Sequence, residues 1–392
     1  MTFSQRLDRA FFERVQDRVR ARATEAGLDA VLTDDPEDVA YLTGFFHHPC
    51  ERPVAVWLPA DGGATLLLPE LEREHAEAQH AVADLVSYPE YPGVVPPFAV
   101  LAGAVGAGRR KAGHTTSMTY ARLSAAAAAL STAELVPTDL VTVARYVKEP
   151  GEVVLHQEAA RITDVMLTEG VKLVTDALAT GAALPSEAEL ATHVGRVGTS
   201  TMYGEHTDVV VVSFLAGGLV YAGANSSYPH GLPSSYRLRP GDTFMLSLGC
   251  AVGGRFVEGE RTFVLGEPTD EQRRYHETIR LAQEVGGHAI KPGAECRSAN
   301  EACLAVVKEA GLGRYLRHRQ GHGIGLGMHE PPWLEDGDAT VLEPGMIVSN
   351  EPGIYVPGHA GYRISDSMLV TEDGSRPLTS YPRSLDHCVI PV

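Results

Sequence analysis

The sequence is short of positive charge and of long apolar runs. Its 392 residues include 33 Lys and Arg against 50 Asp and Glu, for a net charge of −17. So acidic a chain is a poor partner for nucleic acid or for an anionic membrane surface, because both attract basic patches. No apolar run approaches the roughly 18 residues that a membrane-spanning helix needs. We therefore expect neither nucleic acid nor a membrane as a partner.

Cysteine is also scarce. The five Cys residues are odd in number, widely spaced and never arranged as CxxC, which argues against a disulfide framework. The N-terminal segment MTFSQRLDRAFFERVQDRVR is charged and amphipathic and has no signal-peptide core. We expect a reduced, cytoplasmic protein.

The remaining composition is that of a folded globular protein, with 44% hydrophobic and 21% charged residues. In the first 140 residues helix and strand patterns alternate, which predicts an α/β domain. The expected elements there are a helix ending at Gly27, strands at 29–33, 52–58 and 64–69, and a helix at 70–81. A turn at 146–151 (YVKEPG) precedes a long helix, so we expect two domains, 1–147 and 148–392.

The most informative stretch of the second domain is 237–266, RLRPGDTFMLSLGCAVGGRFVEGERTFVLG. An apolar run follows the turn signal Gly241-Asp242 and is typical of a buried strand. Gly253-Gly254 is typical of the turn between paired strands. We predict a hairpin whose return strand covers 255–265.

Two glutamates share one face of that return strand. Side chains alternate along a strand, so Glu258 and Glu260 point the same way, and Ser247 on the first strand can lie near them. Neighbouring carboxylates are costly unless a metal, a cation or a shared proton offsets their repulsion. A solvated strand face that carries glutamates is the alternative interpretation.

Other expected elements surround the hairpin. Ser186 is a candidate N-cap before a helix. The run at 208–214, DVVVVSF, predicts a buried strand. We also expect helices at 269–289 and 298–310, a strand after the turn at 343–346, and a last strand pair at 361–369.

The hairpin resembles that of the pita-bread family, which includes methionine aminopeptidase, aminopeptidase P, prolidase and creatinase. In the first domain, YLTGF and RPVAVWLPADGGATLLLPELE resemble the N-terminal domain of creatinase and aminopeptidase P. The resemblance implies an α/β (α+β) protein in which such a domain precedes a pita-bread domain, a curved antiparallel sheet backed by helices. It also implies a homodimer in which the N-terminal domain caps the neighbouring site.

The resemblance further implies a degenerate metal site. The family's five ligand positions correspond here to Ser247, Glu258, His322 (in GHGIG), Glu351 (in SNEPGIY) and Ser365. The two serines stand where the metallopeptidases have Asp and a Glu that bridges two metals, and neutral Ser is a poor ligand for divalent ions. We therefore expect no cofactor. A single weakly bound divalent ion on Glu258, His322 and Glu351 is the alternative.

The site pattern is similar to that of creatinase, which works without metal. His230 stands at the spacing of the creatinase His that shuttles protons, and Glu260-Arg261-Thr262 resembles the hairpin whose Glu contacts a guanidinium group. The resemblance implies His230 as acid/base, Glu260 and Glu351 as a cation clamp, and His322 and His329 as substrate or oxyanion contacts. Substrate-binding roles are expected for Arg52, Glu258 and Arg363.

Three functions remain open at this point. The favoured one is a metal-independent, creatinase-like hydrolase that cleaves a C–N bond, amidine or amide, of a small cationic or zwitterionic substrate. The second is a metal-dependent Xaa-Pro dipeptidase or aminopeptidase with a reduced metal site. The third is a non-catalytic protein that uses the pocket to bind a ligand, which the complete set of polar site residues argues against.

Overall fold

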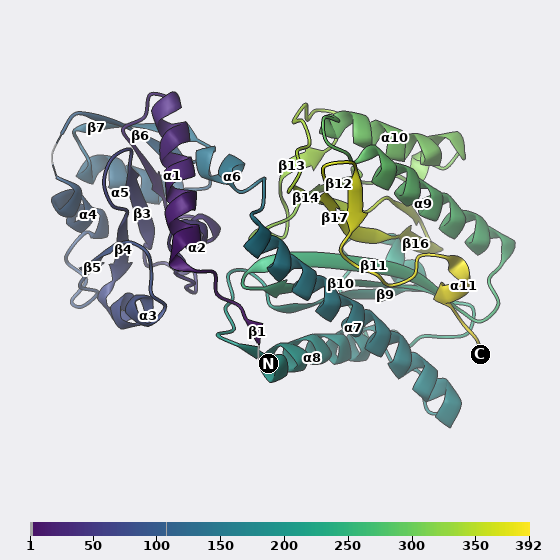
Figure 1. Ribbon diagram of the computed structural model, residues 1–392. Coiled ribbons are helices and arrows are strands. Elements are labelled where there is room, and N and C mark those ends of the chain that lie inside the picture. The colour runs from purple at the N-terminus through teal and green to yellow at the C-terminus, as the bar shows by residue number, and fades with distance from the viewer. Residues whose placement is uncertain (1–2, 107) are drawn as a thin grey trace. The chain divides into compact units, whose positions relative to one another are not determined.

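The computed structural model describes residues 3–106 and 108–392, which form two compact units (Figure 1). The N-terminal unit comprises Arg6–Arg145 together with Val210–Val212. The C-terminal unit comprises Tyr146–Val209 and Ser213–Val392 and includes the segment that ends at Gln5.

A six-stranded sheet forms the centre of the N-terminal unit, in the order β5-β4-β3-β2-β6-β7. β3 is antiparallel to both of its neighbours, and the other neighbouring strands are parallel. The strands are β2 (Ala30–Thr33), β3 (Ala55–Pro59), β4 (Thr65–Pro69), β5 (Asp84–Tyr88), β6 (Arg110–Thr115) and β7 (Ala133–Thr138). The helices are α1 (Arg9–Glu25), α2 (Pro36–Thr43), η1 (Glu70–Glu72), α3 (Arg73–Ala78), α4 (Pro97–Val105), α5 (Tyr120–Ala129) and α6 (Leu140–Ala144). The predicted α/β character of this part of the chain is confirmed.

Local sequence signals explain where these helices begin and end. The carboxylate of Asp35 caps α2 by accepting a hydrogen bond from the amide of Glu37 at 3.0 Å. The helix ends at Gly44, whose φ of 73° is a left-handed conformation that favours glycine. α1 likewise stops just before Gly27, which has a φ of 68°. The strands predicted at 29–33, 52–58 and 64–69 are confirmed by β2, β3 and β4, with small shifts at their ends.

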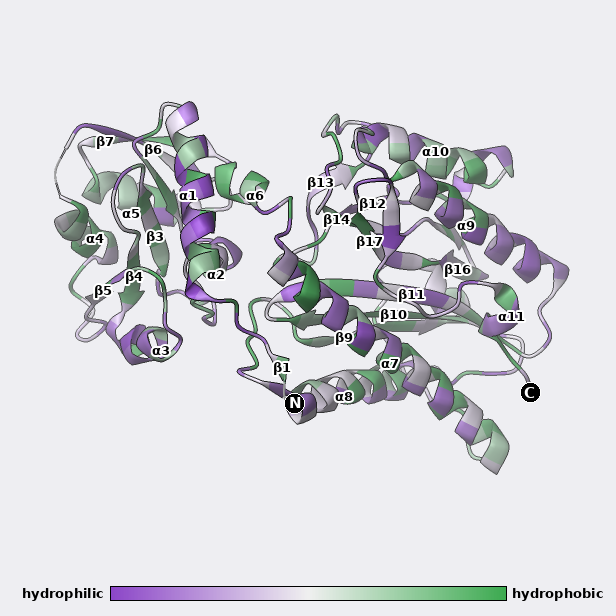
Figure 2. Cartoon of the chain, viewed as in Figure 1, coloured by the Kyte–Doolittle hydropathy of each residue, from purple (hydrophilic) through white to green (hydrophobic). Residues whose placement is uncertain are grey.

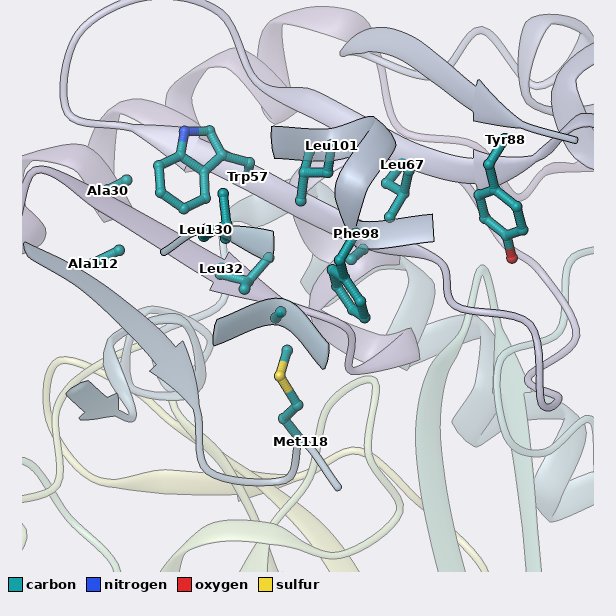
Figure 3. Packing of buried hydrophobic residues seen from close by; sticks show 12 residues of the cluster. Ala30, Leu32, Trp57, Leu67, Tyr88, Phe98, Leu101, Ala112, Met118 and Leu130 are labelled. Carbon is teal, nitrogen blue, oxygen red and sulfur yellow. The ribbon is translucent and has the colours of Figure 1, made fainter. Parts of the chain in front are cut away.

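The core of the N-terminal unit lies between this sheet and its helices (Figure 3). Trp57 of β3 packs with Phe98 and Leu101 of α4 and with Leu130, and all four are at most 6% exposed. Burying apolar surface stabilises the folded state by about 25 cal/mol per Å².

Helix α1 carries many hydrophilic residues, as Figure 2 shows.

A nine-stranded sheet forms the centre of the C-terminal unit, in the order β13-β12-β14-β17-β11-β10-β9, with β18 beside β17 and β19 beside β11. All pairings are antiparallel except that of β19 with β11. The strands are β9 (Ala216–Ala222), β10 (Thr243–Val252), β11 (Arg255–Leu265), β12 (Gly321–Gly323), β13 (Glu330–Leu334), β14 (Ile347–Asn350), β17 (Ser365–Val370), β18 (Ser375–Pro377) and β19 (Val389–Ile390). Two small ladders join β1 (Phe3–Ser4) to β8 (His206–Thr207) and β15 (Gly353–Val356) to β16 (Ala360–Arg363). The predicted antiparallel sheet is confirmed.

Helices back this sheet, and α7 packs on β10 and β11 while α8 packs on β9. The helices are α7 (Pro150–Thr180), α8 (Glu187–Glu205), η2 (Gly223–Ser227), α9 (Asp270–Ala289), α10 (Cys296–Glu309), η3 (Gly313–Tyr315) and α11 (Leu385–Cys388). α8 begins at the predicted N-cap. Ser186 and Glu189 there exchange side-chain and backbone hydrogen bonds of 2.9 and 3.2 Å.

The central hairpin is confirmed as predicted. β10 and β11 are joined by Gly253 and Gly254, whose φ values of 57° and 75° suit a tight turn between twisted strands. The strand predicted at 208–214 is wrong. The chain there is irregular, and Asp208 has a φ of 56°, which interrupts an extended backbone just before β9 begins at Ala216.

All five cysteines are unpaired, and four of them are buried. Within residues 3–106 and 108–392, we find no helix that combines the length and the apolar character needed to cross a membrane.

Candidate active site

The C-terminal unit contains a cavity of about 810 Å³, within the ~300–1,000 Å³ range of small-molecule sites. Strands, loops and the irregular segment after η3 all contribute to its wall. Its hydroxyl-bearing and ionisable side chains include those of His230, Ser247, Glu258, Glu260, Arg317, His318, Arg319, His322, His329, Glu335, Glu351 and Arg363. The structure therefore brings together every predicted site residue of the second domain except Ser365, which adjoins Glu258.

Three neighbouring strands bring Ser247, Glu260 and Ser365 into one row. Ser247 of β10 lies opposite Glu260 of β11, and Glu260 lies opposite Ser365 of β17. Glu258 is two residues away along β11, so it projects from the same face of the sheet, as predicted. Glu258 and Glu260 are only 7% and 5% exposed, which rules out a solvated strand face.

The carboxylate of Glu260 is paired with a guanidinium of the same chain. Arg363 of β16 donates from Nη2 to Glu260 Oε1 at 2.8 Å and from Nε to Glu260 Oε2. Its remaining hydrogens reach the hydroxyls of Tyr355 at 2.9 Å, Ser247 at 3.0 Å and Tyr221 at 3.1 Å. The result is a buried two-pronged ion pair. The substrate-binding role predicted for Arg363 stays a prediction, but most of its donors are already used within the protein.

Two serines of β17 hold Glu258. Ser365 Oγ donates to Glu258 Oε1 at 2.8 Å. Ser367 Oγ accepts from the Glu258 amide and donates to its carbonyl, both at 3.1 Å. Because Oε1 is engaged by Ser365, Oε2 is the oxygen left to face the rest of the cavity.

Glycines place His322 close to other backbone. A Cβ at Gly321 would lie 2.1 Å from the carbonyl oxygen of Ser349, and one at Gly323 would lie 2.5 Å from that of Pro331. Neither distance is compatible with a side chain, so the GHG segment of β12 allows an approach that only glycine permits.

His322 then presents one ring nitrogen to the two carboxylates. Its Nδ1 donates to the carbonyl of Gly323 at 2.9 Å. The other nitrogen, Nε2, lies 3.3 Å from Glu351 Oε1 and 3.8 Å from Glu258 Oε2. Among the described residues Nε2 has no hydrogen-bond partner, although His322 is 1% exposed. The two carboxylates are the nearest acceptors, and a nitrogen that faces them without a hydrogen bond is placed to bind an ion together with them.

The charges of this cluster compete with one another. Burial raises the pKa of Glu258 to about 8, and the carboxylate of Glu351 adds to the effect. Burial opposes a charge on His322, but the carboxylates of Glu351 and Glu258 outweigh it and raise the pKa of His322 to about 9. Burial likewise disfavours the charge on Glu351, yet contact with His322 keeps the pKa of Glu351 low. Such mutual perturbation is typical of functional sites.

Two further histidines line the open part of the cavity. The ring of His329 lies 4.0 Å from that of His322, and burial together with the charge of His322 lowers the pKa of His329 to about 4. A neutral His329 both donates and accepts hydrogen bonds at pH 7. His230 is exposed at the cavity wall.

The site fits one divalent ion. Ligand atoms of Glu258, His322 and His329 all lie within 4.8 Å of one another, and Glu351 Oε1 adjoins His322 Nε2. Carboxylate oxygens and imidazole nitrogens are suitable donors, and three protein ligands with an open position are a catalytic pattern. Neither Ser247 nor Ser365 adds a charged ligand.

Some site residues have no counterpart in the sequence-based prediction. Tyr355 connects two parts of the site, because its hydroxyl accepts from Arg363 and lies 2.8 Å from His318 Nε2. A tyrosine within an apolar strand gives no signal of such a role. Arg52, predicted to bind substrate, belongs to the N-terminal unit and pairs there with Glu90 and Glu51.

Known proteins resemble the chain over nearly its whole length. The Metallopeptidase family M24 matches residues 154–372, and the Creatinase/Prolidase N-terminal domain matches residues 16–147. The chain is 32% identical over 391 residues to the probable dipeptidase PepE of Mycobacterium tuberculosis, covering 99% of each chain. It is 30% identical over 382 residues to the Xaa-Pro dipeptidase of Lactobacillus delbrueckii subsp. lactis, covering 96% of this chain and 99% of that one. The crystal structure of the dipeptidase PepE from Mycobacterium ulcerans matches with a TM-score of 0.85 at 28% identity, over 99% of this chain and 100% of that one.

These findings correct one expectation. The prediction that the protein needs no cofactor is wrong, because the family that matches most of the C-terminal unit is one of metallopeptidases. The metal-independent, creatinase-like interpretation also finds no support among relatives named as dipeptidases. That prediction was based on the two serines that replace ligands at five family positions. The three remaining ligands, Glu258, His322 and Glu351, are enough to hold an ion.

Three observations point to the same family. They are the N-terminal α/β unit, the antiparallel sheet with its buried Glu–His cluster, and the match of both units to known domains. This chain belongs to the metallopeptidase family M24 and is a hydrolase that acts on C–N bonds.

Proposed function

We propose that the protein is a metal-dependent dipeptidase that cleaves the peptide bond of Xaa-Pro dipeptides. The observation that carries the proposal is the convergence of Glu258 Oε2, Glu351 Oε1 and the unpartnered His322 Nε2 at one point of the cavity wall. The choice of substrate is supported by relatives named Xaa-Pro dipeptidase and probable dipeptidase. Glu258, His322 and Glu351 would hold the ion, and His329 is within reach of the same place.

When bound, a divalent ion would supply a Lewis acid and lower the pKa of a water molecule. The chain's own residues supply position and proton transfer. Ser365 fixes the rotamer of Glu258 through its 2.8 Å hydrogen bond. The Gly323 carbonyl fixes the ring of His322, so that Nε2 faces the carboxylates.

His230 and His329, on the open wall of the cavity, would contact the substrate. His230 is exposed at the cavity wall, and an imidazole can both accept and donate a proton, so it would return a proton to the leaving nitrogen. The pKa of His329 is lowered by partial desolvation at the cavity and by the charge of His322, and its neutral ring would hydrogen-bond the substrate carbonyl. Such proton transfer typically contributes ~10²–10⁴-fold to a rate.

An amidine substrate is less well served by this site. The clamp expected for a substrate guanidinium consisted of Glu260 and Glu351. Arg363 already occupies Glu260 with two hydrogen bonds. A second cation would have to displace a buried ion pair, which is costly.

The test is the release of proline from Xaa-Pro dipeptides. Protein stripped with a chelator and desalted should be inactive, and activity should return with Mn²⁺ or Co²⁺. Ala-Ala and a guanidino compound serve as comparison substrates. The proposal would be contradicted by a rate of proline release that changes neither with chelator nor with added metal. Turnover of the guanidino compound without any cleavage of dipeptides would also contradict it.

The predicted homodimer and the cap supplied by the neighbouring N-terminal domain form part of the proposal, as does the role of Arg52 at the substrate carboxylate. Light scattering would distinguish the mass of one chain from that of two. If the proposal is right, Arg52→Ala raises KM for the dipeptide without removing the bound ion. A single-chain mass at working concentrations would contradict the dimer.

A further inference from the structure

We infer that the active site holds one divalent ion per chain, and that the ion pair of Arg363 with Glu260 occupies the part of the site where a second ion would need ligands. The inference rests on the proposed metal-dependent function and deepens it. The two serines at family ligand positions, Ser247 and Ser365, each bond a glutamate of the site.

Ser247 faces a cation of the protein itself. Its hydroxyl donates to Glu260 Oε1 and accepts from Arg363 Nη2 at 3.0 Å. Arg363 is 4% exposed and is also held by Tyr355 and Tyr221. A divalent ion bound through Ser247 would therefore lie beside a fixed guanidinium, and like charges repel strongly in a buried site.

On the opposite side of the row, Ser365 ties up Glu258. Its hydroxyl donates to Glu258 Oε1 at 2.8 Å. A carboxylate that bridges two ions needs both of its oxygens, and here only Oε2 points to the orphaned Nε2 of His322, at 3.8 Å. Glu258 is thus arranged to serve a single ion.

The charge of the inner site gives an independent argument. An imidazole that binds an ion through Nε2 is neutral, so His322 adds no charge once the site is filled. Glu258, Glu260 and Glu351 supply three negative charges when ionised, and Arg363 cancels one of them through its contact with Glu260. One divalent ion neutralises the remaining two charges. A second would leave a net positive charge among buried groups, which is unfavourable.

The experiment is a count of bound metal on the full-length protein. Chelator-treated protein is titrated with Co²⁺, and visible absorption and elemental analysis after desalting report the stoichiometry. We expect saturation at one ion per chain. Two tightly held ions, or none, would overturn the inference.

A reverted variant tests the cause. Ser247→Asp and Ser365→Glu give the residues that the family resemblance implies at these positions, and Glu260→Thr removes the carboxylate that fixes Arg363 beside Ser247. We expect this chain to bind two ions. A folded triple variant that still binds one ion would overturn the roles given to Arg363 and the serines. If the triple variant does not fold, the count on the unaltered chain remains decisive.

A second group of potential ligands calls for a control. Glu158, Glu205 and His206 also cluster, although Arg161 already bonds both of those carboxylates. Glu205→Gln should leave the count at one, whereas loss of the ion in this variant would place it outside the cavity and overturn the inference. Metal counts are independent of turnover. One bound ion without Xaa-Pro cleavage would contradict the proposed function alone, and two ions with cleavage would contradict this inference alone.

Discussion

Arg363 and Glu260 lie on different strands and meet in a two-pronged, nearly solvent-free ion pair. Ser247 lies against both partners, donating to the carboxylate and accepting from the guanidinium. Tyr355 and Tyr221 accept further hydrogen bonds from Arg363, so this guanidinium is held by several groups of the protein. In the same cavity, Nε2 of His322 makes no hydrogen bond within the described part of the chain and faces the carboxylates of Glu351 and Glu258.

Breaking this pair should destabilise the protein. Arg363→Met leaves Glu260 buried without its counter-charge, and removal of one partner of such a pair costs about 3–5 kcal/mol. The double variant Glu260→Gln/Arg363→Met should recover part of the loss, because no bare carboxylate remains. Urea unfolding of the three proteins measures the effect. Arg237→Met, in an exposed pair with Glu189, is the matched control and should shift the midpoint little. Equal losses in the single and double variants would contradict the prediction.

Removing His322 should abolish metal binding. His322→Ala takes away the imidazole nitrogen that faces Glu258 and Glu351 and leaves two carboxylates to repel each other. We expect elemental analysis to find almost no ion after desalting and dipeptide cleavage to fall to background. His288→Ala, an exposed histidine of α9, is the control. Retention of a full ion by His322→Ala would contradict the ligand assignment.

His230 should act on the rate and not on the metal. His230→Ala removes the proposed acid/base from the exposed wall of the cavity, and kcat should fall by ~10²–10⁴-fold. Bound metal and the circular dichroism spectrum should stay unchanged, since the side chain is exposed. Undiminished kcat would remove His230 from the mechanism.

The pH dependence of stability should include a contribution from His156. This residue of α7 is buried, its Nδ1 donates to the carbonyl of Phe256, and burial lowers its pKa well below the usual value. The unfolded chain takes up a proton near pH 6.5 and the folded chain does not, so stability falls as pH drops below about 6.5, by at most about 1.4 kcal/mol per pH unit.

His156→Asn keeps a donor for Phe256 but does not titrate. The thermal unfolding midpoint of this variant should therefore fall less between pH 7.5 and pH 5 than that of the unaltered protein. An identical pH dependence in the two proteins would show that His156 does not contribute.

Much of the fold was predictable because its signals are local. A Gly-Gly turn after an apolar run predicted the β10–β11 hairpin, and strand alternation placed Glu258 and Glu260 on one face. The cap at Ser186 needs only the residues that follow it. The strand predicted at 208–214 is wrong because strand pairing is not a local property. An apolar run shows a tendency to be extended but does not show whether a partner strand exists, and the backbone turns at Asp208 instead.

The sequence by itself determined the hairpin, the family resemblance, and the set of His and Glu side chains from which the site is built. Only the tertiary structure decided which of those side chains pair with each other and which converge on His322. Glu260 has the chemistry to bind a substrate cation, but the fold brings Arg363 from another strand to its carboxylate. Glu258 and Glu351 lie far apart in the chain, yet both reach His322 Nε2. Charge pairing depends on distance in space, and a sequence records distance only along the chain.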